Sequence, residues 1–324
     1  MPAQTVVVTD HDFEDLSIER GILGDVANLV ELSSQMGERP KDATEQLANA
    51  DGILNLRYDL NADAITSLNN CKIIARYGIG VDNVAVDAAA ARQIPVTNVP
   101  DYCLEEVATH AISLVLALAR DAVRYNDSVA DGAWDRDVGV PLHRLSTQTV
   151  GIVGFGAIGR AVAERLGGFG PDLLVSDPFL EPADVADSDA ELVEFEELLD
   201  RSDYITIHSP LTDSTRGLFD ADAFARMKDT AVLVNVARGP IVDTDALSIA
   251  LDNGSLAGVG LDVFPEEPPE TDDPLRTHER VLTTPHVAWY SEEANTERRR
   301  AAAENVRAAL LGEEIENVVN DVET

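Results

Sequence analysis

Three polar residues with complementary chemistry follow apolar segments in the second half of the sequence: Arg238, Glu267 and His286. In open parallel sheets, ligands bind beyond the carboxyl ends of the strands. A guanidinium can hold a carboxylate in a forked grip, an imidazole can give or take a proton near neutral pH, and a nearby carboxylate would stabilise the charged imidazole. Each residue alone is more typical of a surface position. Together they predict a catalytic set for reducing a 2-oxo acid, with Arg238 on the carboxylate and His286–Glu267 as the acid/base pair.

A glycine-rich segment precedes these residues and has the context of a dinucleotide-binding turn. It follows the apolar run TVGIV and opens a helical pattern over residues 160–166. Such a turn brings backbone N–H groups and a helix N-terminus to a pyrophosphate. The expected cofactor-binding residues of the turn are Gly154, Phe155, Gly156, Ala157, Ile158 and Gly159.

Asp177 ends the next apolar run, 18 residues after Gly159. A carboxylate at this place can accept hydrogen bonds from the adenosine ribose and repels a 2′-phosphate. Pro178 and Phe179 supply no compensating cation. We therefore predict NAD rather than NADP, with a simple cap of the strand end as the alternative role for Asp177.

The elements that position these residues alternate between apolar runs of strand length and helical patterns, which indicates parallel α/β folding. In the first part, strands are expected near residues 6–8, 29–32, 52–54, 72–75 and 95–97, with helices that include 63–68 and 84–92. One long helix is expected over residues 104–130. Further strands are expected near 149–153, 173–176, 204–207, 231–235, 258–262 and 281–283, before a final helix over 292–311.

This order predicts an α/β protein with two Rossmann-like, doubly wound parallel-sheet domains separated by a cleft. Residues 100–287 would form the NAD-binding Rossmann domain. Residues 1–99 plus 288–324 would form a flavodoxin-like substrate (catalytic) domain, because the final helix could pack back on the first unit.

The charge balance restricts the classes of partner. The 324 residues include 59 acidic and 24 basic ones, which gives a formal net charge of -35. A field of this sign repels phosphate backbones and anionic lipids, so neither nucleic acid nor a membrane is expected as a partner. Concentrated salt screens self-repulsion, with a Debye length of about 3 Å at 1 M. The composition therefore favours a halophilic protein, with an ordinary acidic protein as the alternative.

The cysteines indicate no metal site, and the N-terminal residues and apolar runs indicate neither export nor insertion into a membrane. Cys71 and Cys103 are the only cysteines and do not form a metal-type spacing, so no metal or disulfide framework is expected. The first twelve residues do not read as a signal peptide. The longest apolar run, 111–119, is shorter than the ~20 residues needed to span a bilayer. A cytoplasmic location is therefore expected.

Several motifs resemble the D-isomer-specific 2-hydroxyacid dehydrogenase family over essentially the whole chain. The main ones are GFGAIGR (154–160), HSPLTDST (208–215), VNVARG (234–239), GLDVFPEEP (260–268) and TPH (284–286). YGIGVD (77–82) and IPVTNVP (94–100) resemble its substrate-domain and hinge segments. PHVAWYSEEA (285–294) and VPDYC (99–103) look closest to the C-terminal-binding-protein branch.

The resemblance implies an oxidoreductase that transfers a hydride between NAD(H) and C2 of a D-2-hydroxy acid or 2-oxo acid. It implies a homodimer that pairs through the cofactor domain and the long helix at 104–130, although a helix buried within its own domain would show the same apolar face. Further cofactor-binding residues would be His208, Pro210, Thr215, Val236, Ala237 and Asp262. Substrate would meet Arg57, Trp289 and the backbone of Gly78 and Ile79.

Some alternatives stay open. An NADH-sensing, corepressor-like binding protein would keep the same catalytic residues. A formate dehydrogenase relative would carry Gln where this chain has Glu267. Arg57 lies in a segment, 55–60, that matches no subfamily pattern, so a surface role is the alternative. Trp289 suits an apolar substrate side chain, and nothing marks a phosphate pocket, which disfavours 3-phosphoglycerate without naming the acid.

Overall fold

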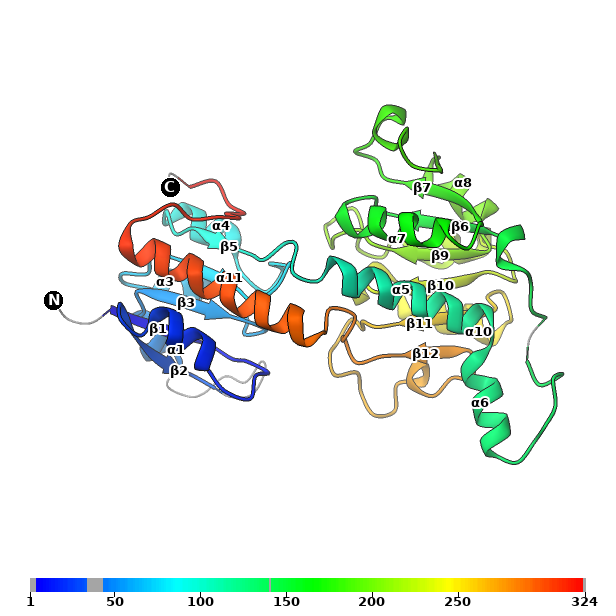
Figure 1. Cartoon of the computed structure of the whole chain (residues 1–324), viewed down its shortest axis with the longest axis horizontal. Helices are drawn as coiled ribbons and strands as arrows, with labels where there is room; N and C mark the ends of the chain where they lie inside the picture. The colour runs from blue at the N-terminus through cyan, green and yellow to red at the C-terminus, as the bar shows by residue number, and fades with distance from the viewer. Residues whose placement is uncertain (1–3, 34–42, 140, 323–324) are drawn as a thin grey trace. The chain divides into compact units, whose positions relative to one another are not determined.

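The computed structural model describes residues 4–33, 43–139 and 141–322, which fall into two compact units (Figure 1). Unit 1 comprises Met1–Cys103 with Ser291–Thr324, and unit 2 comprises Leu104–Tyr290. The chain thus passes between the units after residues 103 and 290. Each crossing lies a few residues later than the boundaries predicted from the sequence, which fell after residues 99 and 287. Each unit contains one parallel sheet with helices on both faces, as predicted for the fold class.

The sheet of unit 1 has five parallel strands in the order β2-β1-β3-β4-β5. This is the flavodoxin-like order, in which the chain switches direction across the sheet between β1 and β3. The strands are β1 (Gln4–Val8), β2 (Ala27–Glu31), β3 (Gly52–Asn55), β4 (Ile74–Arg76) and β5 (Val96–Thr97).

Among the described residues of unit 1, five helices cover this sheet. α1 (Ser17–Leu23) and α11 (Glu292–Leu311) lie together, and α11 packs on β3 and β4, where Val306 faces Gly52. The other face is covered by α2 (Ala43–Ala48), α3 (Ala62–Ser67) and α4 (Val86–Ala91), whose aliphatic side chains join those of the strands in one buried cluster. Burial of each Leu, Ile or Val side chain in this cluster stabilises the fold by about 1.5–3 kcal/mol.

The sheet of unit 2 has seven parallel strands in the order β12-β11-β10-β9-β6-β7-β8. This is the Rossmann order with one added strand, and the direction switches between β6 and β9. The strands are β6 (Thr149–Val153), β7 (Asp172–Ser176), β8 (Ala190–Leu192), β9 (Tyr204–Ile207), β10 (Val232–Asn235), β11 (Gly258–Leu261) and β12 (Val281–Thr283). β8 was not predicted from the sequence, because it is a three-residue edge strand without a buried residue.

Helices also cover both faces of the second sheet (Figure 1). α5 (Leu104–Ala119) and α7 (Ala157–Gly167) pack against each other, and α5 also contacts β10 and β11. α8 (Phe195–Arg201), α9 (Ala221–Arg226) and α10 (Thr244–Asp252) contribute to the buried aliphatic cluster beneath the sheet. Short 3-10 turns are η1 (Leu145–Thr147), η2 (Pro182–Val185), η3 (Gly239–Ile241) and η4 (Pro274–Arg276).

The prediction of one continuous helix over residues 104–130 was wrong. α5 ends at Ala119 and α6 (Ala122–Ala130) begins after Asp121, whose φ of 49° lies in the left-handed region. α5 is held by packing against its own unit, whereas α6 buries none of its residues. The apolar face of α5 is therefore explained within unit 2. Among the described helices, none is long and apolar enough to cross a bilayer.

Candidate active site

The glycine-rich turn connects β6 to α7 and lies at the point where the strand order of unit 2 switches direction. Gly154 has a φ of 88°, and a Cβ there would lie 2.7 Å from the backbone nitrogen of Ser209. A Cβ on Gly159 would lie 2.3 Å from the carbonyl oxygen of Gly154. Beside Gly156, in contrast, a Cβ would meet no described atom within 4 Å beyond its chain neighbours. The turn therefore combines two steric requirements for glycine with open space where a pyrophosphate would approach, and it fits a dinucleotide.

The remaining residues of the turn divide between packing and exposure. The Phe155 ring is buried, and the guanidinium carbon of Arg160 lies 4.6 Å from its centroid. Gly156 and Ala157 are exposed, and Ile158 is half-buried. Because its ring is buried, Phe155 can face a bound cofactor only through its backbone, whereas Gly156 and Ala157 are open to it.

Asp177 lies directly after β7 and is bonded to the turn itself. Its Oδ2 accepts a hydrogen bond from the backbone N–H of Phe155 at 2.9 Å, and its Oδ1 accepts one from Phe179 at 3.1 Å. The carboxylate is thus fixed beside the start of the turn and remains half-exposed. Contact with an adenosine ribose stays a prediction at this position.

A third loop follows β9 and contains three predicted cofactor residues. The Oγ1 of Thr215 donates to the Pro210 carbonyl at 2.6 Å, which closes the loop. Nε2 of His208 lies 2.9 Å from Oγ1 of Thr206, while its Nδ1 is buried with no hydrogen-bond partner among the described residues. Burial lowers the pKa of His208 to about 3, so the ring is neutral near pH 7. His208 can therefore shape this loop but adds no positive charge for phosphates.

The Arg238 loop is held by an asparagine at the end of β10. Nδ2 of Asn235 donates to the Arg238 carbonyl at 2.9 Å, and its Oδ1 accepts from the Ala237 N–H at 3.0 Å. Gly239 then packs against the backbone of Phe264, since an added Cβ would lie 2.0 Å from the Phe264 carbonyl carbon. Val236 is buried, and Ala237 is half-buried. Sequence reasoning missed the role of Asn235, a buried polar residue ending an apolar strand.

Glu267 and His286 form a direct pair. Nδ1 of His286 lies 2.6 Å from Oε2 of Glu267, and the two side chains are 29% and 21% exposed. Oε1 of Glu267 accepts from the N–H of Phe264 at 3.1 Å. Because Gly239 packs on the same Phe264 backbone, the loops of Arg238, Glu267 and His286 are contiguous after three neighbouring strands, β10, β11 and β12. The pair leaves Nε2 as the imidazole atom directed away from Glu267.

Asp262, at the end of β11, holds the backbone that follows His286. Its carboxylate accepts from the N–H groups of Val287 and Ala288, each at 2.9 Å, and from Oγ1 of Thr284 at 2.5 Å. His110 of α5 contacts the Thr284 hydroxyl in turn, with its Nε2 2.9 Å from Oγ1 of Thr284. The Asp262 side chain is 0% exposed. Its predicted contact with the cofactor stays a prediction, and the structure adds a positioning role that the sequence did not reveal.

Two further features complete this part of unit 2. His286 has a φ of 54°, which a side chain adopts only when its surroundings hold it. Trp289 donates from Nε1 to the His286 carbonyl at 2.9 Å. Trp289, a predicted substrate contact, therefore belongs to the same turn as His286 and helps to hold it.

The predicted substrate backbone lies in unit 1, in the loop after β4. The Gly78 carbonyl accepts from the N–H of Val99 at 3.1 Å, and the Ile79 carbonyl accepts from Nδ2 of Asn98 at 2.8 Å. Arg76 donates from Nε to the Gly80 carbonyl at 2.9 Å. With the carbonyls held, the N–H groups of Gly78 and Ile79 are the expected contacts for a substrate carboxylate.

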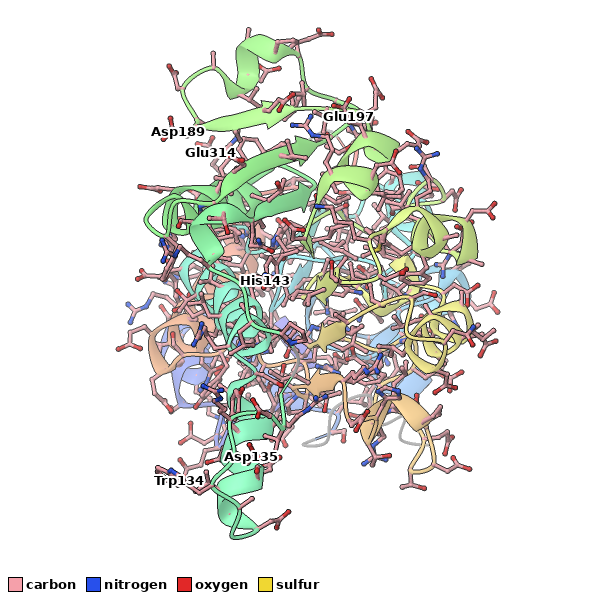
Figure 2. The ribbon with its side chains drawn as sticks, turned by 90° about the vertical axis from the view of Figure 1, so that its right-hand side faces the viewer. Trp134, Asp135, His143, Asp189, Glu197 and Glu314 are labelled. Atoms are coloured by element: carbon pink, nitrogen blue, oxygen red, sulfur yellow. The ribbon has the colours of Figure 1, made fainter. Side chains whose placement is uncertain are left out.

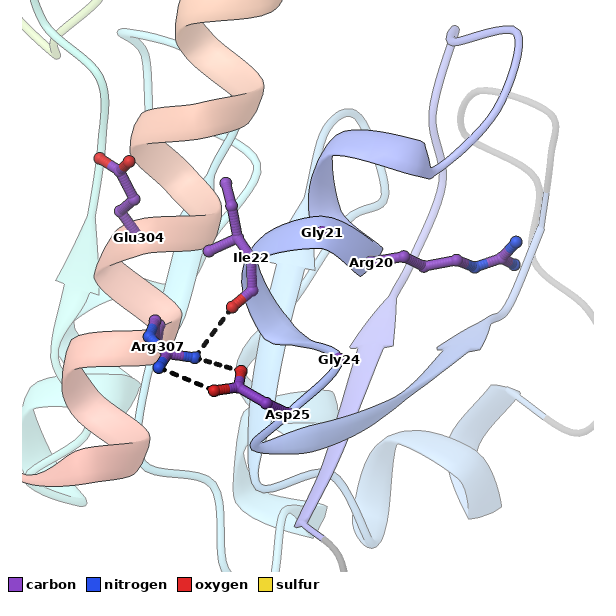
Figure 3. Close-up of a pocket in the computed structure, with 7 residues that line it drawn as sticks. All are labelled: Arg20, Gly21, Ile22, Gly24, Asp25, Glu304 and Arg307. Carbon is purple, nitrogen blue, oxygen red and sulfur yellow. Dashed lines mark hydrogen bonds and ion pairs between the residues drawn. The ribbon is translucent and has the colours of Figure 1, made fainter.

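A surface pocket of unit 1 lies between α1 and α11, and none of the predicted site residues lines it (Figure 3). Arg307 donates there to the Ile22 carbonyl and to both carboxylate oxygens of Asp25, while Arg20 points away from α11. Arg307 and Asp25 are thus engaged with one another. Within the described parts of the chain, no three His, Cys, Asp or Glu side chains are grouped to hold a metal ion.

Sequence comparisons agree with this arrangement. The profile of the D-isomer specific 2-hydroxyacid dehydrogenase NAD binding domain matches residues 112–288. The chain is 39% identical over 283 residues to D-3-phosphoglycerate dehydrogenase of Mycobacterium leprae, which covers 86% of this chain and 53% of that protein. It is 37% identical over 310 residues to glyoxylate reductase of Korarchaeum cryptofilum, which covers 93% of each chain. The chain thus spans about half the length of the phosphoglycerate dehydrogenases it matches.

A solved structure shares the whole architecture. The D-lactate dehydrogenase of Aquifex aeolicus, in complex with NAD and lactic acid, is 28% identical and superposes with a TM-score of 0.86 over 95% of this chain and 96% of that one. The names of these relatives give no support to the corepressor-like alternative, and the resemblance to the C-terminal-binding-protein branch remains a prediction. The matched profile covers more than half of the chain and includes the glycine-rich turn and the Arg238, Glu267 and His286 loops. The chain belongs to the D-isomer-specific 2-hydroxyacid dehydrogenase family, and residues 112–288 are its NAD-binding domain.

Proposed function

We propose that this protein is an NAD-dependent dehydrogenase that interconverts a D-2-hydroxy acid and its 2-oxo acid. The observation that supports this most is the 2.6 Å contact between His286 Nδ1 and Glu267 Oε2, in loops contiguous with the Arg238 loop. Proton transfer by a positioned imidazole is the chemistry that reduction of a carbonyl to an alcohol requires.

The proton is held and moved by His286. Glu267 accepts a hydrogen bond from Nδ1, which orients the ring and directs Nε2–H toward the substrate oxygen. When bound, NADH supplies the hydride that C2 of the 2-oxo acid receives. As C2 is reduced, Nε2 gives its proton to the developing alkoxide, and Glu267 stabilises the imidazolium before that transfer. In the oxidative direction, Nε2 takes the proton from the hydroxyl.

In unit 2, we expect Arg238 to bind the substrate carboxylate. In unit 1, the N–H groups of Gly78 and Ile79 remain the predicted substrate contacts. The planar fork of arginine matches a carboxylate better than a lysine ammonium does. Arg57 and Trp289 contact the remainder of the substrate. Arg238→Lys should therefore raise the KM for the 2-oxo acid by about tenfold or more, with the Kd for NADH within twofold of wild type.

Cofactor choice depends on Asp177. Its carboxylate is fixed beside the glycine-rich turn, where it would bind ribose hydroxyls and repel a 2′-phosphate. Further contacts with the cofactor are expected from Pro210, Thr215, Val236, Ala237 and Asp262. Steady-state kinetics with both cofactors check this choice, since a preference for NADPH would contradict it.

The protein pairs as a homodimer through α6 rather than through the buried face of α5. Val123 and Val129 of α6 are 45% and 51% exposed, and Trp134 is 92% exposed. Trp134 and Asp135 follow shortly after α6 and lie beside it in Figure 2. An exposed apolar set of this kind favours a protein contact. Light scattering should give a dimer for the wild type and a shift toward monomer for Trp134→Ser.

Adaptation to concentrated salt follows from the surface. Exposed carboxylates include Asp135, Asp189, Glu197 and Glu314 (Figure 2). Screening of their repulsion should raise the melting temperature between about 0.1 and about 3 M KCl. A melting temperature that does not rise with salt would contradict this proposal.

The decisive experiment is a steady-state assay with NADH and a panel of 2-oxo acids. The panel includes glyoxylate, hydroxypyruvate, 3-phosphohydroxypyruvate, pyruvate, and branched and aromatic 2-oxo acids. Turnover with at least one acid, reversed with the matching D-hydroxy acid but not with its L-isomer, is the expected result. NADH binding without turnover of any acid would overturn the proposal in favour of a sensor.

A further inference from the structure

The loop after β3 presents one basic side chain between two buried neighbours. Leu56 and Tyr58 are 7% and 6% exposed, whereas Arg57 between them is half-exposed. This loop follows β3 beside β1, the place where the strand order of unit 1 switches direction. In open α/β sheets, that switch point is where ligands bind.

Asp10 holds the backbone of this loop. It lies two residues after β1 and is 0% exposed. Its Oδ2 accepts from the N–H of Arg57 at 2.8 Å, its Oδ1 accepts from the N–H of Leu56 at 3.2 Å, and Oγ1 of Thr9 donates to Oδ1 at 2.8 Å. A buried carboxylate with several N–H and O–H donors is a strong and directional acceptor.

The carbonyl groups of the same loop are held as well. Nδ2 of Asn83 donates to the carbonyls of Leu56 at 3.3 Å and Tyr58 at 2.9 Å. Nδ2 of Asn55 also donates to the Tyr58 carbonyl, at 2.9 Å. The backbone on both sides of Arg57 is therefore fixed by side chains of three different segments.

The same arrangement occurs in unit 2. Asp262 follows β11, is buried, and accepts two successive N–H groups after the neighbouring strand β12, with a threonine hydroxyl donating to it. There the held segment is the turn of His286. Asp10 repeats this arrangement at the switch point of unit 1, with Arg57 on the held segment and with Thr9, its own neighbour in the chain, as the hydroxyl donor.

We propose that Asp10 is a positioning residue that fixes the 56–58 backbone so that Arg57 contacts the substrate beyond its carboxylate. This inference rests on the proposed dehydrogenase function. An Asn at position 10 would keep one acceptor oxygen and set an amide N–H₂ against one of the two backbone N–H groups. The loop would then move, and the guanidinium would leave its place without any change at the proton-transfer residues.

The test compares Asp10→Asn, Arg57→Ala and the double variant in the full chain, with the best 2-oxo acid of the panel. Asp10→Asn should raise the KM for the acid by about tenfold, with kcat within about threefold of wild type and the Kd for NADH unchanged. Arg57→Ala should raise KM by at least as much. The double variant should be no worse than Arg57→Ala, because residues that act through one another are non-additive. Multiplying effects would overturn the proposal.

Matched variants distinguish a role of Asp10 in positioning the loop from a mere loss of negative charge or of the folded structure. Asp63→Asn removes the same charge from an exposed position at the start of α3 and should leave KM unchanged. Thr9→Val removes the hydroxyl that donates to Asp10 and should raise KM by a smaller factor, which keeps the test available if Asp10→Asn does not fold. An unchanged KM in Thr9→Val and in any folded Asp10→Asn would overturn the proposal. A wild type that turns over no acid would instead overturn the proposed function.

Discussion

Two buried aspartates, one in each unit, hold the loop after the neighbouring strand, but the side chains that these loops present differ. Asp262 holds the segment after His286, whose φ of 54° places it in the left-handed region and whose ring is paired with Glu267 at 2.6 Å. Asp10 holds the segment of Arg57, a long side chain with several rotatable bonds. Proton transfer needs one nitrogen in one place, whereas an arginine can partly follow a displaced ligand. Equal backbone support should therefore matter more to kcat in unit 2 and more to KM in unit 1.

The largest effect is expected from removing the imidazole. His286→Ala should lower kcat by about 10²–10⁴-fold, the usual contribution of a positioned acid/base group. The Kd for NADH, measured by fluorescence titration, should stay within threefold. His143→Ala, an exposed histidine of the same unit (Figure 2), is the control and should retain full activity. Retention of wild-type kcat in His286→Ala would remove the basis for assigning different roles to the two units.

A smaller loss is expected when the support of His286 is weakened. Asp262→Asn sets an amide N–H₂ against the N–H of Val287 or Ala288 and should relax the left-handed turn. We expect kcat to fall by about 10–100-fold, with less than a threefold change in the KM of the 2-oxo acid. Parallel kinetics with Asp10→Asn sharpen the comparison, since a KM effect in unit 1 and a kcat effect in unit 2 should separate. A kcat effect for Asp10→Asn together with a KM effect for Asp262→Asn would contradict the different roles assigned to the two units.

His110 tests whether the support in unit 2 extends to α5. Its Nε2 donates to Thr284, which donates to Asp262. His110→Leu removes that donor and should lower kcat by about two- to tenfold, while His110→Gln restores an N–H donor and should recover part of the loss. Equal kcat in the Leu variant and wild type would limit the positioning group to Asp262 and Thr284.

The smallest effect concerns stability and involves neither loop. Burial lowers the pKa of His208 from 6.5 to about 3 in the folded state. Because the unfolded chain binds the proton more readily, the contribution of this neutral imidazole is complete above the unfolded pKa and is lost as pH falls toward the folded pKa. Between pH 7 and pH 5 the wild type should lose about 1–2 kcal/mol more unfolding free energy than His208→Asn. Denaturant titrations at both pH values check this prediction. An equal loss of unfolding free energy between pH 7 and pH 5 in the wild type and in His208→Asn would contradict it.

The pattern of apolar residues was sufficient to predict the strands that are buried on both faces. The apolar runs at 149–153 and 204–207 coincide with β6 and β9, and the last helix has the predicted bounds of α11. It was insufficient for β8, a short edge strand without a buried residue, because little burial leaves little apolar signal. It was also insufficient at Asp121, where no glycine or proline marks the break between α5 and α6. That break occurs where contact with the sheet of unit 2 is lost, which is a tertiary property.

The glycine-rich turn could be predicted because its steric requirements act on single residues that only glycine satisfies. The Arg238, Glu267 and His286 set could be predicted because each residue follows a recognisable strand. The positioning groups behind them were not visible: Asn235, Asp10, and the chain from His110 through Thr284 to Asp262. Each of these connects residues far apart in sequence, and nothing in local composition indicates which backbone N–H a buried carboxylate will meet.

The amino-acid sequence by itself therefore determined which chemistry is available to this protein: a turn for a dinucleotide, a cation for a carboxylate and an imidazole for a proton. These follow from residue type and from spacing within a few residues. Tertiary structure alone decided which atoms are held and by what, from the His286–Glu267 contact to the two buried aspartates. Hydrogen bonds act over about 3 Å, and only the packed sheets bring strand ends that are tens of residues apart within that distance.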